Sequence, residues 1–493
     1  MPLRLSAATT GALAFAVPLA VLLASAQTDV GFWDTADLQT VAWIAGIPYP
    51  TGFPGYVVLG WLWTHAIPLG SVALRLNLLS ALAIAAGSAT VAAIAMLFDV
   101  TPALAFAGGV LFAFARQIWM RGTYADAHPL GFALAFGALA LALRWSRRGD
   151  ARALNGAILL TGVALAVDNT TLLMLIGALI AALGRRWPFG AVRRPIVVAV
   201  AVVLAAYAYL PLRSAYVTAH ALDPTLAIGL PAGRPFWDDH HPSTVDGFLS
   251  LVTGTEWTPG YTLSRLLTPE ALVRATSRFG PALNDAFPDG LLLAALGGLV
   301  ALAFAEPLAA LALAVAAVLP ACFGASYQAE ADPERYVFAL YALAALGVAV
   351  AADRVVRALG RGRLVLALGV AIAVLAAVAV RDVVLARDLV ADHAQARGSA
   401  LAARVAASTR DGAIVVAPWD FVTPIAYHAY VDRAMGRRIV VCALATEDIE
   451  DYPDWTKRGQ LAIVSYGEPQ IPGFRTRLLD ATQRPEIYEI LPP

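Results

Sequence analysis

Charged residues are scarce in this chain. Only 14% of its 493 residues are Asp, Glu, Lys or Arg, 59% are hydrophobic, and the formal net charge is zero. A chain without net positive charge lacks the positive electrostatic field that attracts nucleic acids, so no nucleic acid partner is expected. The mean hydropathy of +0.68 lies well outside the range of soluble domains. The composition therefore predicts a polytopic protein embedded in a lipid bilayer.

Cysteine and the common nucleotide motifs are also nearly or wholly lacking. The two cysteines, Cys322 and Cys442, lie far apart in the sequence, which argues against a zinc knuckle or a disulfide framework. The sequence contains no Walker loop, no dinucleotide-binding glycine loop and no serine-hydrolase elbow. Nucleotide-driven transport and acyl hydrolysis therefore have no support.

Long apolar runs are abundant up to Val380 and then stop. Runs near the ~20 residues needed to cross a bilayer predict a mainly α, polytopic helical fold with about eleven spans. We expect the spans at Ala8 to Ala26, Ala73 to Phe98, Ala103 to Ile118, Leu130 to Leu143, Leu154 to Val167, Thr170 to Leu183, Pro195 to Leu212, Gly290 to Ala305, Leu308 to Phe323, Tyr336 to Ala352 and Leu364 to Val380.

Two apolar segments near the N-terminus allow alternative readings. The first run ends in Ala24-Ser25-Ala26, which resembles a signal-peptidase site, but its length favours an uncleaved helix. Gly52 to Pro68 contains Trp61, Trp63 and His65, so it fits an interfacial helix as well as a crossing.

The arginine clusters predict which loops lie outside. With Arg4 in the cytoplasm, alternation of the spans places the clusters at 144–152, 184–194 and 353–363 all inside, as the positive-inside rule requires. The same alternation places outside the segments 27–69 and 213–289 and everything after the last span. We therefore expect an extracytoplasmic active site and C-terminal domain.

The chain divides into a membrane domain, residues 1–380, and a small domain, residues 381–493. In the second part, "AIVVAP", "RIVVCAL" and "LAIVSYG" are typical of short buried strands, and a helical stretch near Phe421 to Ala434 separates the first two. The pattern predicts a small α/β domain.

The segment Gly31 to Tyr56 carries two acids, Asp34 and Asp37. In one reading Asp34 caps a short helix with Asp37 at its third position, and Gly46 with the following prolines ends that helix. In the other reading the two carboxylates share a helix face and one acts as a general base at the membrane surface. Both readings stay open, because a cap uses only one oxygen.

The sequence that follows resembles a known family. The stretch "WDTADLQTVAWIAGIPYPTGFPGY", followed by Gly70-Ser71 and by Arg75, Asn77 and Leu78, is similar to the start of the protein O-mannosyltransferase-like membrane proteins of the GT-C superfamily. Asp34 and Asp37 stand at the family's two acidic positions. Tyr49 and Asn169 stand where the family has histidines.

This resemblance implies a GT-C glycosyltransferase. Such an enzyme moves mannose or a similar hexose from a polyprenyl-phosphate donor to a protein or glycan acceptor outside the membrane, with inversion at the anomeric carbon. An acid of the first outer loop, Asp34 or Asp37, would be the catalytic base. No cofactor beyond the lipid-linked donor is implied, and a need for a divalent metal stays open.

The donor phosphate would need cations near the outer surface, because charge grows on it as the glycosidic bond breaks. Arg213 and Arg335 are predicted at outer span ends, against the usual charge bias, and Arg75 lies in the family motif. The alternatives for Arg213 and Arg335 are contact with lipid headgroups or pairing with Asp332 or Glu334.

Other polar and aromatic residues are candidates for sugar or acceptor binding. They come from the Pro/Gly turn, from "YADAHP" and from "APWDF" after a predicted strand: Tyr49, Tyr124, Asp126, His128, Trp419 and Asp420. For Asp126, His128 and Asp420 a helix cap is the alternative. "WDDHH", residues 237–241, has metal-ligand residue types, but adjacent residues seldom surround one ion, so no metal site is predicted.

Two other functions remain possible. A transporter would use ionisable groups within the membrane, and Asp168 is the acid predicted there. A noncatalytic protein of the same fold would bind glycans with its outer domain, and the departures at Tyr49 and Asn169 keep this possibility open.

Overall fold

The computed structural model describes residues 6–254, 266, 268–288, 290–326, 333–359, 381, 384–393 and 397–492. The chain forms two compact units. Unit 1 comprises Met1–Ala26, Leu78–Ala206 and Thr255–Val390, and unit 2 comprises Gln27–Asn77, Tyr207–Gly254 and Ala391–Pro493. Most of the two segments expected as outer loops thus group with the C-terminal residues.

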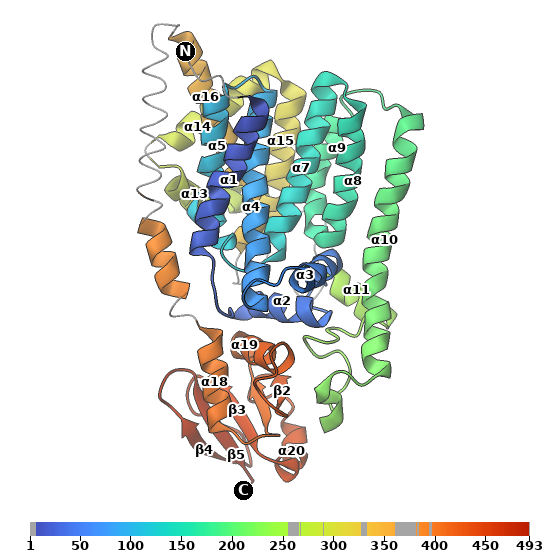
Figure 1. Ribbon diagram of the computed structural model, residues 1–493, viewed down its shortest axis with the longest axis vertical. Coiled ribbons are helices and arrows are strands. Elements are labelled where there is room, and N and C mark those ends of the chain that lie inside the picture. The colour runs from blue at the N-terminus through green and yellow to red at the C-terminus, as the bar shows by residue number, and fades with distance from the viewer. Residues whose placement is uncertain are drawn as a thin grey trace. The chain divides into compact units, whose positions relative to one another are not determined.

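Unit 1 is a bundle of apolar helices that run side by side (Figure 1). Its elements, of which α4 begins and α10 ends in unit 2, are α1 (Ala7–Ser25), α4 (Val72–Leu97), α5 (Pro102–Ala113), α6 (Arg116–Arg121), α7 (Ala127–Arg148), α8 (Ala151–Val167), η1 (Asn169–Thr171), α9 (Leu172–Ala182), α10 (Phe189–Ala219), α13 (Pro269–Ala286), α14 (Leu291–Ala305), α15 (Pro307–Ser326), η3 (Pro333–Tyr336) and α16 (Phe338–Ala358).

The expected number of eleven spans is wrong. Among the described residues, six helices are long and apolar enough to cross a membrane, α1, α4, α7, α10, α15 and α16, or up to seven if the bent pair α13 and α14 forms one span. The expected spans at 103–118, 154–167 and 170–183 correspond to shorter apolar helices of 10–17 residues. The predicted span Leu364 to Val380 lies outside the described residues.

Small residues let the helices of unit 1 approach closely. At Gly298 of α14, a Cβ atom would lie 2.0 Å from the backbone oxygen of Gly347 in α16. Glycine at this crossing allows backbone contact that any larger residue would prevent, as is typical of helix packing in membranes. The predicted mainly α membrane fold is confirmed.

Unit 2 combines the segments 27–77 and 207–254 with a sheet domain. Its elements are α2 (Trp33–Ile44), α3 (Pro54–Ala66), η2 (Pro224–Ile228), α11 (Val245–Thr253), α18 (Gly398–Ser408), β1 (Ile414–Ala417), α19 (Trp419–Tyr430), β2 (Ile439–Cys442), η5 (Ile449–Asp451), α20 (Tyr452–Arg458), β3 (Leu461–Ser465), β4 (Arg475–Asp480) and β5 (Glu486–Leu491). With 13 residues, α3 is too short to cross a bilayer. It leaves Val58, Trp61 and Leu62 exposed.

The five strands form one sheet of order β2-β1-β3-β5-β4. Strand β1 pairs in parallel with β2 and β3, whereas β5 pairs antiparallel with β3 and β4. The three predicted strands and the helix between the first two are confirmed as β1, β2, β3 and α19. The sequence prediction missed β5 and the edge strand β4, whose short sequences, EIYEIL and RTRLLD, mix charged and apolar residues without a regular alternation.

Residues far upstream complete the core of the sheet domain. Ile228 and Leu230 of the 207–254 segment pack with Val416, Trp455 and Ile463. The indole nitrogen Nε1 of Trp455 donates a hydrogen bond of 3.1 Å to the carbonyl oxygen of Ile228. The small α/β domain therefore shares its core with part of the 207–254 segment.

The carboxyl end of α2 is held by the 207–254 segment. Arg213 Nη2 donates to the Ile44 carbonyl at 3.0 Å, and Tyr209 donates to the Ala45 carbonyl at 2.5 Å. The Ile47 amide donates to the Phe236 carbonyl at 3.2 Å. The first two bonds use carbonyl groups that the helix end leaves without intrahelical partners.

Substitution of Gly46 by alanine is expected to destabilise unit 2. A Cβ atom at residue 46 would lie 1.9 Å from the backbone oxygen of Phe236, so one of the two backbones must move. We expect a loss of about 3 kcal/mol and a melting temperature lower by roughly 5–10 °C, measured on the purified protein in detergent. Gly297→Ala, where a Cβ atom meets nothing within 4 Å, is the control and should melt as wild type does.

Candidate active site

A chain of buried hydrogen bonds holds the segment that carries Asp34. The Gly31 amide donates to Gln39 Oε1 at 3.0 Å, Gln39 Nε2 donates to Asn77 Oδ1 at 2.9 Å, and Asn77 Nδ2 donates to the Gln27 carbonyl at 2.7 Å. Gln39 and Asn77 are fully buried. The Asn77 of the family motif thus fixes both the entry to α2 and one face of the helix.

The guanidinium group of Arg75 binds backbone carbonyls. Its Nε, Nη1 and Nη2 donate to the carbonyls of Leu69, Thr64 and Gly70 at 3.1, 2.6 and 3.0 Å. The side chain therefore closes the turn between α3 and α4. Its predicted contact with donor phosphate stays a prediction, and the observed bonds give it a structural role.

Asp34 does not cap α2, so the capping prediction was wrong. The N-cap position is Phe32, and Asp34 is the second residue of the helix. Its Oδ1 accepts a hydrogen bond of 3.0 Å from Nε1 of Trp419, 385 residues away in the sequence. The side chain is half-buried. Asp34 is thus an accessible carboxylate oriented by the sheet domain.

Asp37 lies one helical turn further on and is completely buried. Within the described residues, neither of its carboxyl oxygens has a hydrogen-bond partner of normal geometry. Burial raises the pKa of Asp37 well above its usual range, the nearby charges of Asp239 and Asp34 raise it further, and the Tyr49 amide opposes them in part. The Asp37 carboxyl group therefore holds its proton more tightly than an ordinary aspartate does.

Aromatic rings surround the indole of Trp419. The Phe236 ring lies parallel to it with centroids 6.0 Å apart, and the Tyr49 ring meets it edge-on at 6.2 Å. Asp420 follows Trp419 in the first turn of α19, and burial raises the pKa of the Asp420 carboxyl. The structure thus brings Asp34, Tyr49 and Trp419 together.

The acids and histidines of "WDDHH" pair with one another. Asp238 Oδ2 lies 2.6 Å from Nδ1 of His241, and Asp239 Oδ1 lies 2.6 Å from Nδ1 of His240. In the part of the chain that the structure describes, no group of three or more His, Cys, Asp or Glu side chains is placed to hold a metal ion. The charge of Asp239 raises the pKa of Asp37 more than the charge of Asp34 does.

A second polar cluster lies in unit 1 at the start of α7. Asp126 caps this helix: its Oδ1 accepts from the amide and from Nδ1 of His128, both at 2.9 Å, and its Oδ2 accepts from Arg121 at 3.0 Å. Burial would raise the pKa of Asp126, but His128 and the guanidinium groups of Arg121 and Arg335 outweigh it and hold that pKa well below its usual range. Asp126 therefore holds the side chains of Arg121 and His128 in place.

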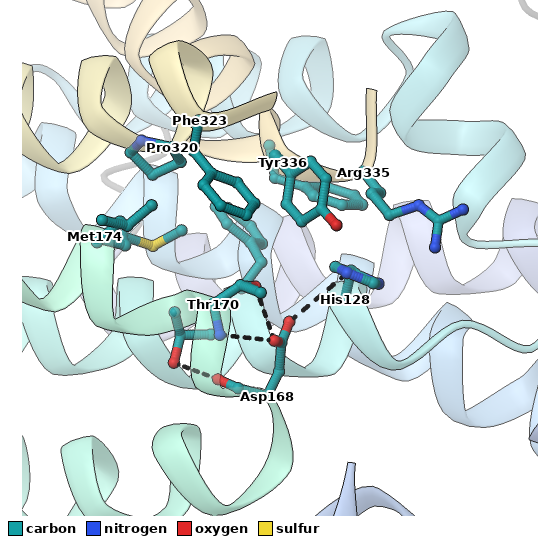
Figure 2. A pocket seen from close by; sticks show the side chains of 12 residues that line it. His128, Asp168, Thr170, Met174, Pro320, Phe323, Arg335 and Tyr336 are labelled. Atoms are coloured by element: carbon teal, nitrogen blue, oxygen red, sulfur yellow. Dashed lines mark hydrogen bonds and ion pairs between the residues drawn. The ribbon is translucent and has the colours of Figure 1, made fainter. Parts of the chain in front are cut away.

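His128, Asp168, Arg335 and Tyr336 line a cavity of about 20 Å³, too small for a hexose (Figure 2). Asp168 Oδ1 accepts from the amide and hydroxyl of Thr170 at 2.9 and 2.7 Å, and its Oδ2 lies 4.0 Å from Nε2 of His128. These contacts make Asp168 the cap of η1, with Oδ1 as the capping oxygen.

Tyr124 lies beside this cluster. The guanidinium carbon of Arg121 sits 5.8 Å from the centre of its ring, a cation–π contact. The sequence singled out Tyr124, Asp126, His128 and Arg335 but missed Arg121, which joins two of them.

Comparisons with known proteins give one family match and a likeness to solved structures. Residues 34–188 match the family model described as "Protein O-mannosyl-transferase TMEM260 N-terminal domain". A comparison with curated proteins finds no match.

Two solved structures of ArnT from Cupriavidus metallidurans have a similar fold. The apo structure gives a TM-score of 0.58 at 14% sequence identity and covers 98% of this chain and 98% of that chain. The structure bound to undecaprenyl phosphate gives 0.57 at 13% identity and covers 97% of each chain. At this identity the likeness establishes the fold. Residues 34–188 therefore resemble the N-terminal domain of that protein O-mannosyl-transferase family, and the chain has the fold of ArnT.

Proposed function

We propose that the protein is a glycosyltransferase that moves mannose from a polyprenyl-phosphate donor to a hydroxyl group of a protein or glycan acceptor. The observation that carries the proposal is the carboxyl group of Asp34, which is half-buried and accepts a hydrogen bond from Trp419. The family match supports mannosyl transfer, and ArnT, which shares the fold, has been solved with undecaprenyl phosphate. The positions of the arginine clusters favour an active site on the outer side of the membrane.

In the proposed reaction Asp34 is the general base. It takes the proton of the acceptor hydroxyl while that oxygen attacks the anomeric carbon of the donor sugar. The bond between the anomeric carbon and the phosphate oxygen breaks, and the lipid phosphate leaves with the electron pair. A single displacement of this kind inverts the anomeric configuration.

Asp37 is poorly suited to be the base because it is fully buried, whereas a base must come within hydrogen-bond reach of the acceptor hydroxyl. Two neighbouring carboxyl groups in different environments often take different roles in catalysis. We propose that Asp37 has a structural role, as a buried residue of the helix α2 that carries Asp34.

Arg335 is the proposed cation for the departing phosphate. Arg335 lines the small cavity together with His128 (Figure 2). The two ring nitrogens of His128 contact Asp126 and Asp168, and these contacts hold the ring in place. Arg213 is the weaker candidate, because its guanidinium caps the end of α2 and lies 5.4 Å from the Tyr216 ring.

Substitution of Asp34 by asparagine is expected to lower transfer by about 10²- to 10⁴-fold, because the variant has no base at this position. The measurement is release of lipid phosphate from short-chain polyprenyl-phosphate mannose, with envelope extract as the source of acceptor. Asp246→Asn, an exposed acid of α11, is the control and should release lipid phosphate at the wild-type rate. Full activity in Asp34→Asn would remove the base assignment, and no release by wild type across several sugar donors would favour a binding protein.

Asp37→Asn is expected to keep most of the activity and to change the pH dependence of stability. Because the folded state holds the Asp37 proton more tightly than the unfolded state does, wild type loses stability as pH rises from about 4 to the raised pKa. Over that window the variant should gain about 1.4 kcal/mol per pH unit relative to wild type. Melting temperatures of both proteins between pH 5 and 8 test this. If the melting temperature changes with pH in the same way in both proteins, the pKa of Asp37 is not raised.

Arg335→Gln is expected to raise the donor KM by about 10- to 100-fold, the range for a lost hydrogen bond to a charged group. Donor titrations of lipid-phosphate release measure it, with Arg410→Gln, an exposed arginine, as the control. An unchanged KM in Arg335→Gln together with a raised KM in Arg213→Gln would transfer the phosphate role to Arg213.

A further inference from the structure

We infer that Trp419 is a positioning residue for the catalytic base Asp34. The inference rests on the proposed function. Its starting point is the hydrogen bond of 3.0 Å from the indole Nε1 of Trp419 to Asp34 Oδ1. The sequence made Trp419 a candidate for sugar or acceptor binding, and in the structure the only hydrogen-bond donor of its side chain bonds to the carboxylate.

The indole is held on two sides. Phe236 lies parallel to it, with only 4° between the ring planes, and Tyr49 meets it at 82°. Trp419 is also the first residue of α19, directly after β1 and the N-cap residue Pro418. A ring packed in this way and rooted at the end of a strand has little freedom to swing away from Asp34.

Helix α19 is itself anchored to segments on both sides of Asp34. The hydroxyl of Tyr427 accepts a hydrogen bond of 3.1 Å from the Ala73 amide. Nε2 of His428 lies 3.0 Å from Oγ of Ser399, which hydrogen-bonds Asp29, five residues before Asp34. The other ring nitrogen of His428 contacts Asp432 at 2.7 Å. The helix that carries Trp419 is therefore fixed to the same segment as the base.

This arrangement matters for the chemistry because a base must lie within hydrogen-bond reach of the proton it removes. An N–H group bonded to one carboxylate oxygen selects one side-chain rotamer and so fixes the direction of the other oxygen. Small errors in such a geometry are costly: a misplacement of 1 Å can reduce a rate about 100-fold.

The test compares three variants of the full-length protein in the lipid-phosphate release assay. Trp419→Phe keeps an aromatic ring without the N–H donor, and Trp419→His restores a ring N–H. Trp455→Phe is the matched control, since it removes an indole hydrogen bond of 3.1 Å to the Ile228 carbonyl in the same domain. Melting temperatures establish that each variant is folded, and rates are expressed per folded molecule.

We expect Trp419→Phe to lower kcat by about 10- to 100-fold with donor and acceptor KM within about twofold of wild type. Trp419→His should recover part of the loss, and Trp455→Phe should keep the wild-type kcat even if it melts earlier. A purely structural role would not separate kcat from KM in this way or respond to the restored N–H.

Other outcomes distinguish the two levels of the proposal. A wild-type kcat in Trp419→Phe, or a raised acceptor KM with unchanged kcat, overturns the positioning role while Asp34→Asn remains inactive. If Asp34→Asn is fully active, the base assignment fails first. If Trp419→Phe does not fold, Trp419→His decides, and a kcat below one hundredth of wild type in a folded Trp419→His overturns the role of the N–H.

Discussion

The buried hydrogen bonds that join Gly31, Gln39, Asn77 and Gln27 are the constraint on which the rest of the candidate site depends. Buried amide groups are costly when they lack partners, so this set of bonds admits one arrangement of α2 relative to the start of α4. Once α2 is fixed, Asp34 and Asp37 differ in their surroundings even though they share one helix. One carboxyl lies at a half-buried surface and meets an indole N–H, and the other is enclosed.

The difference between these two acids is physical and local. Asp37 sits where burial and the charges of Asp239 and Asp34 disfavour its negative charge, which raises the pKa of its carboxyl group. The pKa of Asp126 in unit 1 is shifted in the opposite direction. Its carboxyl group is also buried, but it accepts hydrogen bonds from His128 and Arg121, which lower the pKa and favour the charged form. Burial alone does not decide the state of a carboxyl group; the sign of the neighbouring charges does.

The sequence was sufficient for features that depend on local patterns. Apolar runs located β1, β2 and β3, and the family motif located the segment around Asp34. It was insufficient where the partner is remote. One of the two readings of Asp34 was a cap of its own helix, which follows from a local rule, whereas its observed partner, Trp419, comes from another part of the chain. The span count failed because apolar composition does not reveal that α5 ends at Ala113.

The bond between Asp34 and Trp419 also has a consequence for biosynthesis. The two residues are separated by 385 positions, and chains grow at about 5–20 residues per second, so roughly 20–80 s pass between their synthesis. During that interval the segment with Asp34 exists without the sheet domain that orients it. A nascent or truncated chain therefore presents the acid without its geometry, and the arrangement around Asp34 is completed only when nearly the whole protein has been made.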